Sequence, residues 1–158
     1  MRAFYFIRTG GHNMGQIKIT LKDGHVKEYQ SGTTLFDIAN EISPRLSKEA
    51  VGGSVNDKIV GLDYTIEKDS TVHIFKFEDK EGADIFRHTS SHILAQAVKR
   101  LYPDTKLAIG PSIEEGFYYD FDSEHRFTEE DLEKIEKEMQ KIIQENLYIE
   151  KFELPRNE

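Results

Sequence analysis

The chain has 158 residues, of which 37% are apolar and 32% are charged, and its formal net charge is −8. This length allows one ordinary domain or two small ones, and the apolar fraction supports a packed core. No apolar run approaches the roughly 20 residues that span a bilayer, the absence of cysteine excludes disulfides and thiolate chemistry, and the acidic balance argues against an autonomous nucleic-acid-binding domain, which is normally basic.

The first 14 residues differ in pattern from the segment that begins at Gln16, and they predict a flexible leader with Met14 as an alternative start. They lack the long apolar region and the small-residue cleavage site of a signal peptide. An ordered extra strand at Phe4–Ile7 is the alternative that the pattern leaves open.

Residues 15–77 predict a compact unit of strands and one helix. Apolar and polar residues alternate along Gln16–Leu21, Asp23-Gly24 is a strong turn signal, and His25–Gln30 supplies the returning strand of a hairpin. Thr33 or Thr34 then caps a helix. The apolar residues of that helix have helical spacing, and Ser43-Pro44 ends it: Leu35, Ile38, Ala39 and Ile42.

Two further strands are expected around Gly53–Gly61 and Ser70–Phe77, with turn residues at Asn56-Asp57 and Lys68-Asp69. The resulting order of two strands, a helix and two strands is that of the β-grasp, or ubiquitin-like, fold. The fold class predicted for this part of the chain is therefore α+β.

A charged stretch, Glu78–Asp84, separates this unit from residues 78–158, which predict a second α+β unit. Asp84 is expected to cap a helix from Ile85 to Leu101, and Lys106–Asp122 is expected to form two strands joined by a turn at Glu115-Gly116. The expected buried stripe of this helix is Ile85, Leu94, Ala97, Val98 and Leu101.

The last predicted helix begins after Thr128, with Asp131 at its third position and Phe127 stapled onto Leu132. Its charged residues form a solvated face, and another strand is expected to begin at Ile149. Its apolar stripe is Leu132, Ile135, Met139 and Ile142.

The strongest candidate for a site is the pair His88 and His92, because positions i and i+4 share one face of a helix. A metalloprotease helix needs a glutamate directly after its first histidine, and Thr89 stands there. A structural zinc site needs four ligands, and no other histidine has a matching spacing. The residues alone leave open a functional pair or two half-exposed imidazoles.

A second candidate is the segment that contains Gly110 and Tyr119. A glycine before Pro111 lets the backbone approach a ligand closely, and Tyr118 or Tyr119 offers a hydroxyl. A Gly-Pro bend beside an aromatic core is the alternative. Ser90-Ser91 lacks the sharp turn of a nucleophile and is predicted to be helix surface.

Four segments in this order resemble the N-terminal region of bacterial threonyl-tRNA synthetases, from about Gln16 to Glu158. Val51–Phe75 resembles the TGS domain, and His88–Pro103 resembles the HxxxH helix of the editing domain that these enzymes share with alanyl-tRNA synthetases. Ala108–Asp122 followed by Phe127–Ile142 is more particular to the threonyl enzymes.

The resemblance implies a flexible leader at 1–14, a TGS β-grasp domain at 15–77 and the first part of an α+β editing domain at 78–158. The editing domain of the family hydrolyses serine that has been wrongly esterified to threonine tRNA. By resemblance, His88 and His92 hold the ester and position or activate water, without a covalent enzyme intermediate. Gly110 and Tyr119 are expected to line the same pocket.

The family completes this site with a downstream Cys-x-x-x-His motif, which this chain does not contain. The resemblance therefore implies a fragment with little or no activity alone, with no metal and no cofactor of its own. Zinc, ATP and magnesium are expected in the missing catalytic domain. The full-length enzyme is expected to be cytoplasmic, to bind tRNA(Thr) and to form a homodimer through missing domains. An independent TGS-type RNA- or protein-binding module with a structural second half remains the alternative.

Overall fold

The computed structural model describes residues 15–147, and the contacts within it divide the chain into two units after Ala83. The predicted leader at 1–14 and the predicted strand at Ile149 lie outside the described residues.

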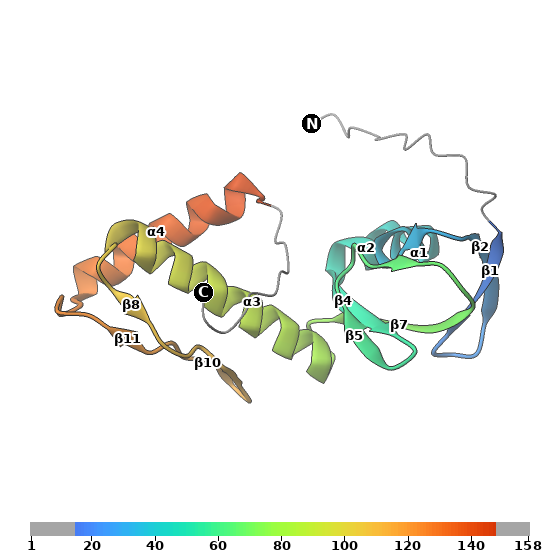
Figure 1. The fold of residues 1–158 in the computed structure, drawn as a ribbon, viewed down its shortest axis with the longest axis horizontal. Coiled ribbons are helices and arrows are strands. Elements are labelled where there is room, and N and C mark those ends of the chain that lie inside the picture. The colour runs from blue at the N-terminus through green and yellow to red at the C-terminus, as the bar shows by residue number, and fades with distance from the viewer. Residues whose placement is uncertain (1–14, 148–158) are drawn as a thin grey trace, which may run out of the picture. The chain divides into compact units, whose positions relative to one another are not determined.

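A five-stranded mixed sheet forms the first unit, in the order β2-β1-β7-β4-β5 (Figure 1). β1 pairs in parallel with β7, and the other neighbours are antiparallel. The two short strands β3 and β6 pair with each other. The bounds are β1 Gln16–Leu21, β2 Val26–Gln30, β3 Thr33–Thr34, β4 Ala50–Val55, β5 Lys58–Val60, β6 Thr65–Ile66 and β7 Ser70–Lys76.

Two tight turns set the register of this sheet. Gly24, with φ of 85°, turns β1 into β2 as predicted. Asn56 and Asp57, with φ of 49° and 65°, join β4 to β5 in the left-handed conformation that a two-residue hairpin turn requires. The segment predicted as one strand around Gly53–Gly61 is therefore a hairpin of two.

Helix α1 (Leu35–Ile42) lies against one face of the sheet and starts at a capping box. The Asp37 amide donates to the Thr34 hydroxyl at 3.1 Å, and the Thr34 amide donates to the Asp37 carboxylate at 3.1 Å. Ser43 ends α1 and also caps α2 (Pro44–Glu49), a helix that was not predicted from the sequence. The apolar cluster between α1 and the sheet contains Ile17, Ile19, Tyr29, Leu35, Ile38, Val55, Val60, Ile66 and Val72.

Helix α3 (Lys80–Leu101) begins five residues before the predicted start at Ile85. The Lys76 amide donates to the Asp79 carboxylate at 2.8 Å, and the Ala83 amide donates to the Asp79 carbonyl at 2.8 Å. The prediction that Asp84 caps this helix was therefore wrong, because the helix begins directly after Asp79, five positions earlier.

The second unit continues with four two-residue strands in place of the two longer strands that were predicted. β8 pairs with β11 and β9 pairs with β10, both antiparallel, so that a bent ribbon runs beside α3 (Figure 1). The bounds are β8 Lys106–Leu107, β9 Ser112–Ile113, β10 Gly116–Phe117 and β11 Phe121–Asp122.

Helix α4 (Glu129–Glu145) packs on α3 through a small apolar cluster formed by Ala97, Val98, Ile135 and Ile142. Leu132 is 60% exposed and so does not belong to the buried stripe that was predicted for it. Phe127, the predicted staple partner of Leu132, packs with Tyr102 and Phe121 at the edge of this cluster.

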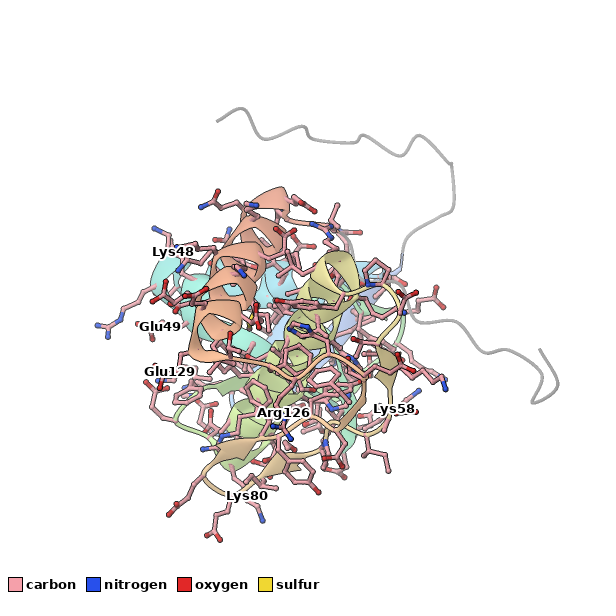
Figure 2. All side chains as sticks on the ribbon, turned by 90° about the vertical axis from the view of Figure 1, so that its left-hand side faces the viewer. Lys48, Glu49, Lys58, Lys80, Arg126 and Glu129 are labelled. Atoms are coloured by element: carbon pink, nitrogen blue, oxygen red, sulfur yellow. The ribbon has the colours of Figure 1, made fainter. Side chains whose placement is uncertain are left out.

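Charged side chains project outward from both units, as Figure 2 shows for Lys48 and Lys58 in the first and for Arg126 and Glu129 in the second. Asp131 differs from these charged residues, because it is only 5% exposed. In residues 15–147, no helix combines the length and the apolar character needed to cross a membrane.

Candidate functional site

Helix α3 brings His88 and His92 together, as their spacing predicted. Their Nε2 atoms lie 3.0 Å apart, and the two rings meet edge to face with centroids 4.5 Å apart. Both imidazoles are exposed on the helix surface. In this contact the Nε2 of one histidine carries a hydrogen and donates it, and the Nε2 of the other accepts it, so the two rings have different roles.

The protonation of His92 is tilted toward the neutral form. The pKa of His92 lies below its ordinary value of 6.5, because partial burial disfavours the charged ring and because His88 lies beside it. A neutral imidazole near pH 7 has a free lone pair and can act as a general base. The geometry therefore supplies one proton acceptor and one proton donor side by side.

Ser91 joins the histidine helix to the segment that contains Gly110. Its Oγ lies 2.7 Å from the His88 carbonyl oxygen and 3.0 Å from the Gly110 carbonyl oxygen, so its single hydrogen is shared between these two acceptors. Ser91 is fully buried, so the prediction that Ser90-Ser91 is helix surface was wrong at Ser91. A signal for its burial was present in the sequence: Ser91 stands three and seven residues before Leu94 and Val98, on their face of the helix.

A second side chain of α3 reaches the same segment. Arg87 Nη1 donates to the Ile113 carbonyl at 3.3 Å. Arg87 and Ser91 are four residues apart, as His88 and His92 are, so the two pairs occupy neighbouring strips of one helix. The segment from Gly110 to Ile113 is thus attached beside the histidines, a link that was not predicted from the sequence.

Gly110 and Tyr119 also meet. A Cβ at Gly110 would overlap the ring of Tyr119, so the close approach requires glycine at this position. Tyr119 in turn stacks on Phe121, with centroids 4.9 Å apart. The structure therefore links the four predicted residues in a chain of contacts: His88 to His92, Ser91 to Gly110, and Gly110 to Tyr119.

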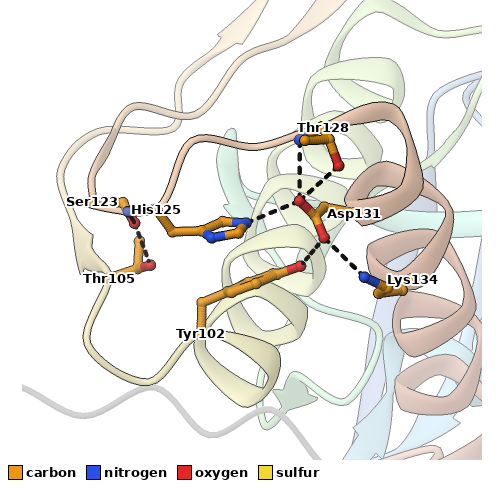
Figure 3. Close-up of polar contacts among 7 residues, drawn as sticks. All are labelled: Tyr102, Thr105, Ser123, His125, Thr128, Asp131 and Lys134. Carbon is orange, nitrogen blue, oxygen red and sulfur yellow. Dashed lines mark hydrogen bonds and ion pairs between the residues drawn. The ribbon is translucent and has the colours of Figure 1, made fainter.

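A polar cluster around Asp131 lies elsewhere in the second unit (Figure 3). The carboxylate accepts hydrogen bonds from Tyr102 Oη at 2.8 Å, His125 Nε2 at 2.9 Å and Lys134 Nζ at 3.0 Å. It also accepts from the amide and the hydroxyl of Thr128 at 3.1 and 2.9 Å. These donors, His125 first, hold the pKa of Asp131 far below its usual range.

A cavity of about 540 Å³ adjoins this cluster. Its lining includes Tyr102, Thr105, Ser123 and His125, and it does not include the histidine pair. Thr105 and Ser123 bond to each other at 3.0 Å, so these polar groups are already satisfied within the protein. The cluster therefore serves to join α3, α4 and the intervening loop.

No group of three or more His, Asp or Glu residues in the part of the chain that the structure describes is placed to hold a metal ion. His88 and His92 supply two imidazole nitrogens, which is half of the four ligands that a structural zinc site uses. An acid–base role for the pair therefore has more support from its geometry than a metal site does.

Comparison with known proteins finds similarity across both units. The TGS domain family matches residues 17–76. Threonine-tRNA ligases of Clostridioides difficile and Acetivibrio thermocellus are 61% and 58% identical to this chain over 142 residues, which is 90% of the chain. The threonine-tRNA ligase of Caldanaerobacter subterraneus subsp. tengcongensis is 55% identical over 94% of the chain. The chain spans about 22% of the length of the curated relatives it matches.

Proposed function

Because residues 17–76 are a TGS domain with the β-grasp fold, and because 90% of the chain is similar to bacterial threonine-tRNA ligases, we propose that the chain is the N-terminal part of such an enzyme. The whole protein would join threonine to tRNA(Thr) with ATP. Its second unit would contribute to the hydrolysis of serine that has been esterified to the same tRNA.

The histidine pair carries the proposal for the second unit. His88 and His92 lie 3.0 Å apart on an exposed helix face, and the Gly110–Ile113 segment is attached beside them. A hydrolytic step is needed because threonine exceeds serine by one methyl group, and one such group gives only about 1–3 kcal/mol of discrimination. A site that cleaves the wrong ester supplies the remaining accuracy.

The chemistry asked of the pair is proton transfer. One neutral imidazole accepts a proton from water as the water oxygen attacks the ester carbonyl carbon. The imidazolium formed in this way then donates that proton to the ribose oxygen as the bond between that oxygen and the carbonyl carbon breaks, while the second imidazole orients the first through the contact of their Nε2 atoms. Serine and free tRNA leave, the base is neutral again, and no covalent enzyme intermediate forms.

The lowered pKa of His92 sets a direction for the pH dependence. A base works in its deprotonated form, so the rate should rise with pH and level off at a lower pH than an unperturbed histidine, of pKa about 6.5, would allow. Gly110 and Tyr119 would line the pocket for the terminal adenosine and its ester.

Other parts of the protein would supply the remaining functions. Zinc, ATP and magnesium would bind in the aminoacylation domain and none of them in this chain, and the homodimer interface would also lie outside it. The enzyme would work in the cytoplasm, where its tRNA partner is. The acidic charge of the chain suits a region that makes few phosphate contacts of its own.

The test is the release of serine from seryl-tRNA(Thr) by the full-length protein that carries this chain. His88→Ala and His92→Ala should each slow hydrolysis by about 10²- to 10⁴-fold, the usual contribution of a general acid or base. His25→Ala is the matched control, because His25 is an exposed histidine of the first unit that pairs with Asp23.

Unchanged hydrolysis in both His88 and His92 variants would contradict the site. A full-length protein that neither charges threonine nor cleaves the serine ester would favour the alternative, an RNA- or protein-binding module built on the TGS domain.

A further inference from the structure

We propose that Ser91 is a positioning residue of the hydrolytic site: its hydroxyl holds the Gly110–Ile113 segment beside His88 and His92. This inference rests on the proposed function of the second unit, and it goes beyond that function by adding a residue that does not itself touch the ester. It also explains why a serine, and not an alanine, stands at a fully buried position of a helix.

Burial and hydrogen bonding single out Ser91. The neighbouring buried positions of α3 are filled by apolar residues, among them Ala95, Ala97 and Val98. Alanine has the higher helix propensity and adds no polar group. A buried hydroxyl costs free energy unless it is paired. The Ser91 hydroxyl shares its hydrogen between the His88 carbonyl in its own helix and a carbonyl outside the helix, that of Gly110, 19 residues away in sequence.

A second hydrogen bond from α3 to this segment fixes the direction in which the segment runs. Arg87 and Ser91 donate to the carbonyls of Ile113 and Gly110 from one strip of the helix. A helix turns about 100° per residue, so the strip of His88 and His92 adjoins it. The segment between the two hydrogen bonds therefore runs along the helix next to the imidazoles, where an ester held against its backbone would meet them.

For the reaction, the Ser91 hydroxyl matters because it affects where the ester is held relative to the imidazoles. The two imidazoles act only if the carbonyl carbon is held in line with the attacking water, and a misplacement of about 1 Å can cost 10²-fold in rate. Without the Ser91 hydroxyl the segment loses one of its two hydrogen bonds to α3, while the proton-transfer groups remain intact. The expected signature is a lower kcat with an unchanged pH midpoint.

Adjacent Ser90 provides a matched control. Its Oγ donates to the Phe86 carbonyl at 2.8 Å within the same helix, as Ser91 Oγ donates to the His88 carbonyl. Ser90→Ala and Ser91→Ala therefore remove the same atom and a similar bond within the helix. They differ in the bond to Gly110.

The experiment measures kcat and KM for serine release from seryl-tRNA(Thr) by the full-length protein, as a function of pH. Ser91→Ala should lower kcat by about 10- to 100-fold with the same pH midpoint, and Ser90→Ala should stay within about twofold of the unmodified protein. Amide hydrogen exchange should speed up at Ile109–Ile113 in the Ser91 variant and stay unchanged in the Ser90 variant.

Each outcome decides the inference. Equal kcat values for the two serine variants, in a protein that hydrolyses the ester and loses that activity with His88→Ala, would overturn it and leave the proposed function intact. Faster exchange with unchanged kcat would also overturn it. A protein with no hydrolysis at all would defeat the proposed function, and the positioning role with it, while the exchange data still test the attachment itself.

If Ser91→Ala does not fold, Arg87→Ala takes its place. This half-buried arginine holds the other end of the segment, and its removal should lower kcat in the same direction and speed exchange at Ile113. Wild-type kcat in that variant would count against the inference.

Discussion

The two units of this chain are held together in different ways. The first has an apolar cluster of nine buried residues between a five-stranded sheet and α1. The second has a cluster of four, and beside it a buried carboxylate with five hydrogen bonds. The first unit thus has an ordinary apolar core with polar groups at its turns and caps, whereas the second has a buried polar cluster beside a small apolar one.

This difference between the two units is relevant to the position of the proposed hydrolytic site. Apolar burial is non-directional, and it tolerates small shifts of the groups involved. Hydrogen bonds to a carboxylate or a carbonyl fix direction as well as distance. The unit with the histidine pair is the one that uses directional contacts, at Asp131 and at Ser91, to fix loops against helices.

The largest effect is expected from opening the apolar core of the first unit. Ile19 is fully buried in the interior strand β1, and Ile19→Ala should cost about 2–5 kcal/mol in the free energy of unfolding. Val26→Ala on the adjacent strand is the control, because Val26 is 60% exposed and should change stability by less than about 0.5 kcal/mol.

Amide hydrogen exchange read separately from peptides of residues 15–83 and 84–147 checks this prediction. The loss should be confined to the first set. Equal losses in both sets would show that the two units unfold as one and would break the comparison.

The sequence predicted the first unit better than the second, because apolar burial leaves a spacing pattern in the sequence and hydrogen bonds between distant residues do not. Alternation along β1 and helical spacing along α1 report apolar burial directly, so the β-grasp order and most of the core were predicted. Asp131 and Ser91 are polar, and polarity in a sequence is normally read as exposure. Their burial depends on partners far along the chain, which spacing does not reveal.

In the candidate site, likewise, one contact was predictable from the sequence and another was not. The contact of His88 with His92 follows from helical geometry and was predictable. The attachment of Gly110 depends on a serine hydroxyl that was assigned to the surface. Leu132 shows the opposite error: its apolar side chain was placed in the core, while the buried position one residue earlier is occupied by Asp131.

The next effect concerns the buried carboxylate of the second unit, Asp131. Asp131→Asn keeps the size of the side chain but turns an NH₂ group toward hydrogen-bond donors, so the thermal midpoint of residues 84–147 should fall by several degrees at about pH 6. The control is Asp122→Asn, which changes an exposed carboxylate that lies 3.5 Å from Lys106, and it should leave the midpoint nearly unchanged.

The pH dependence sharpens this test. Hydrogen bonds from His125, Tyr102 and Lys134 lower the pKa of Asp131 in the folded protein. The unfolded chain therefore takes up the proton first, near pH 3.8, and the stability that Asp131 supplies is full above that pH and is lost as pH falls through the lower folded pKa. The gap between wild type and Asp131→Asn should shrink between about pH 4 and pH 2. A gap that stays constant would mean that the ionised carboxylate is not what stabilises the unit.

The smallest effect is expected at the segment beside the histidines. A methyl group at Gly110 would overlap the ring of the half-buried Tyr119, so Gly110→Ala should displace that ring at a cost of about 1 kcal/mol, the low end for overpacking, and should slow ester hydrolysis. Gly116→Ala on the same ribbon is the matched control, since its Cβ would meet no atom within 4 Å.

Thermal unfolding and serine release measured on both variants separate two accounts of this segment. If it is held by directional contacts, a shifted Tyr119 ring disturbs the hydrolysis more than the fold, and the midpoint falls little while the rate falls clearly. If it is held by packing alone, stability and rate should fall together, and the contrast between the two units would then be weaker than their hydrogen bonds indicate.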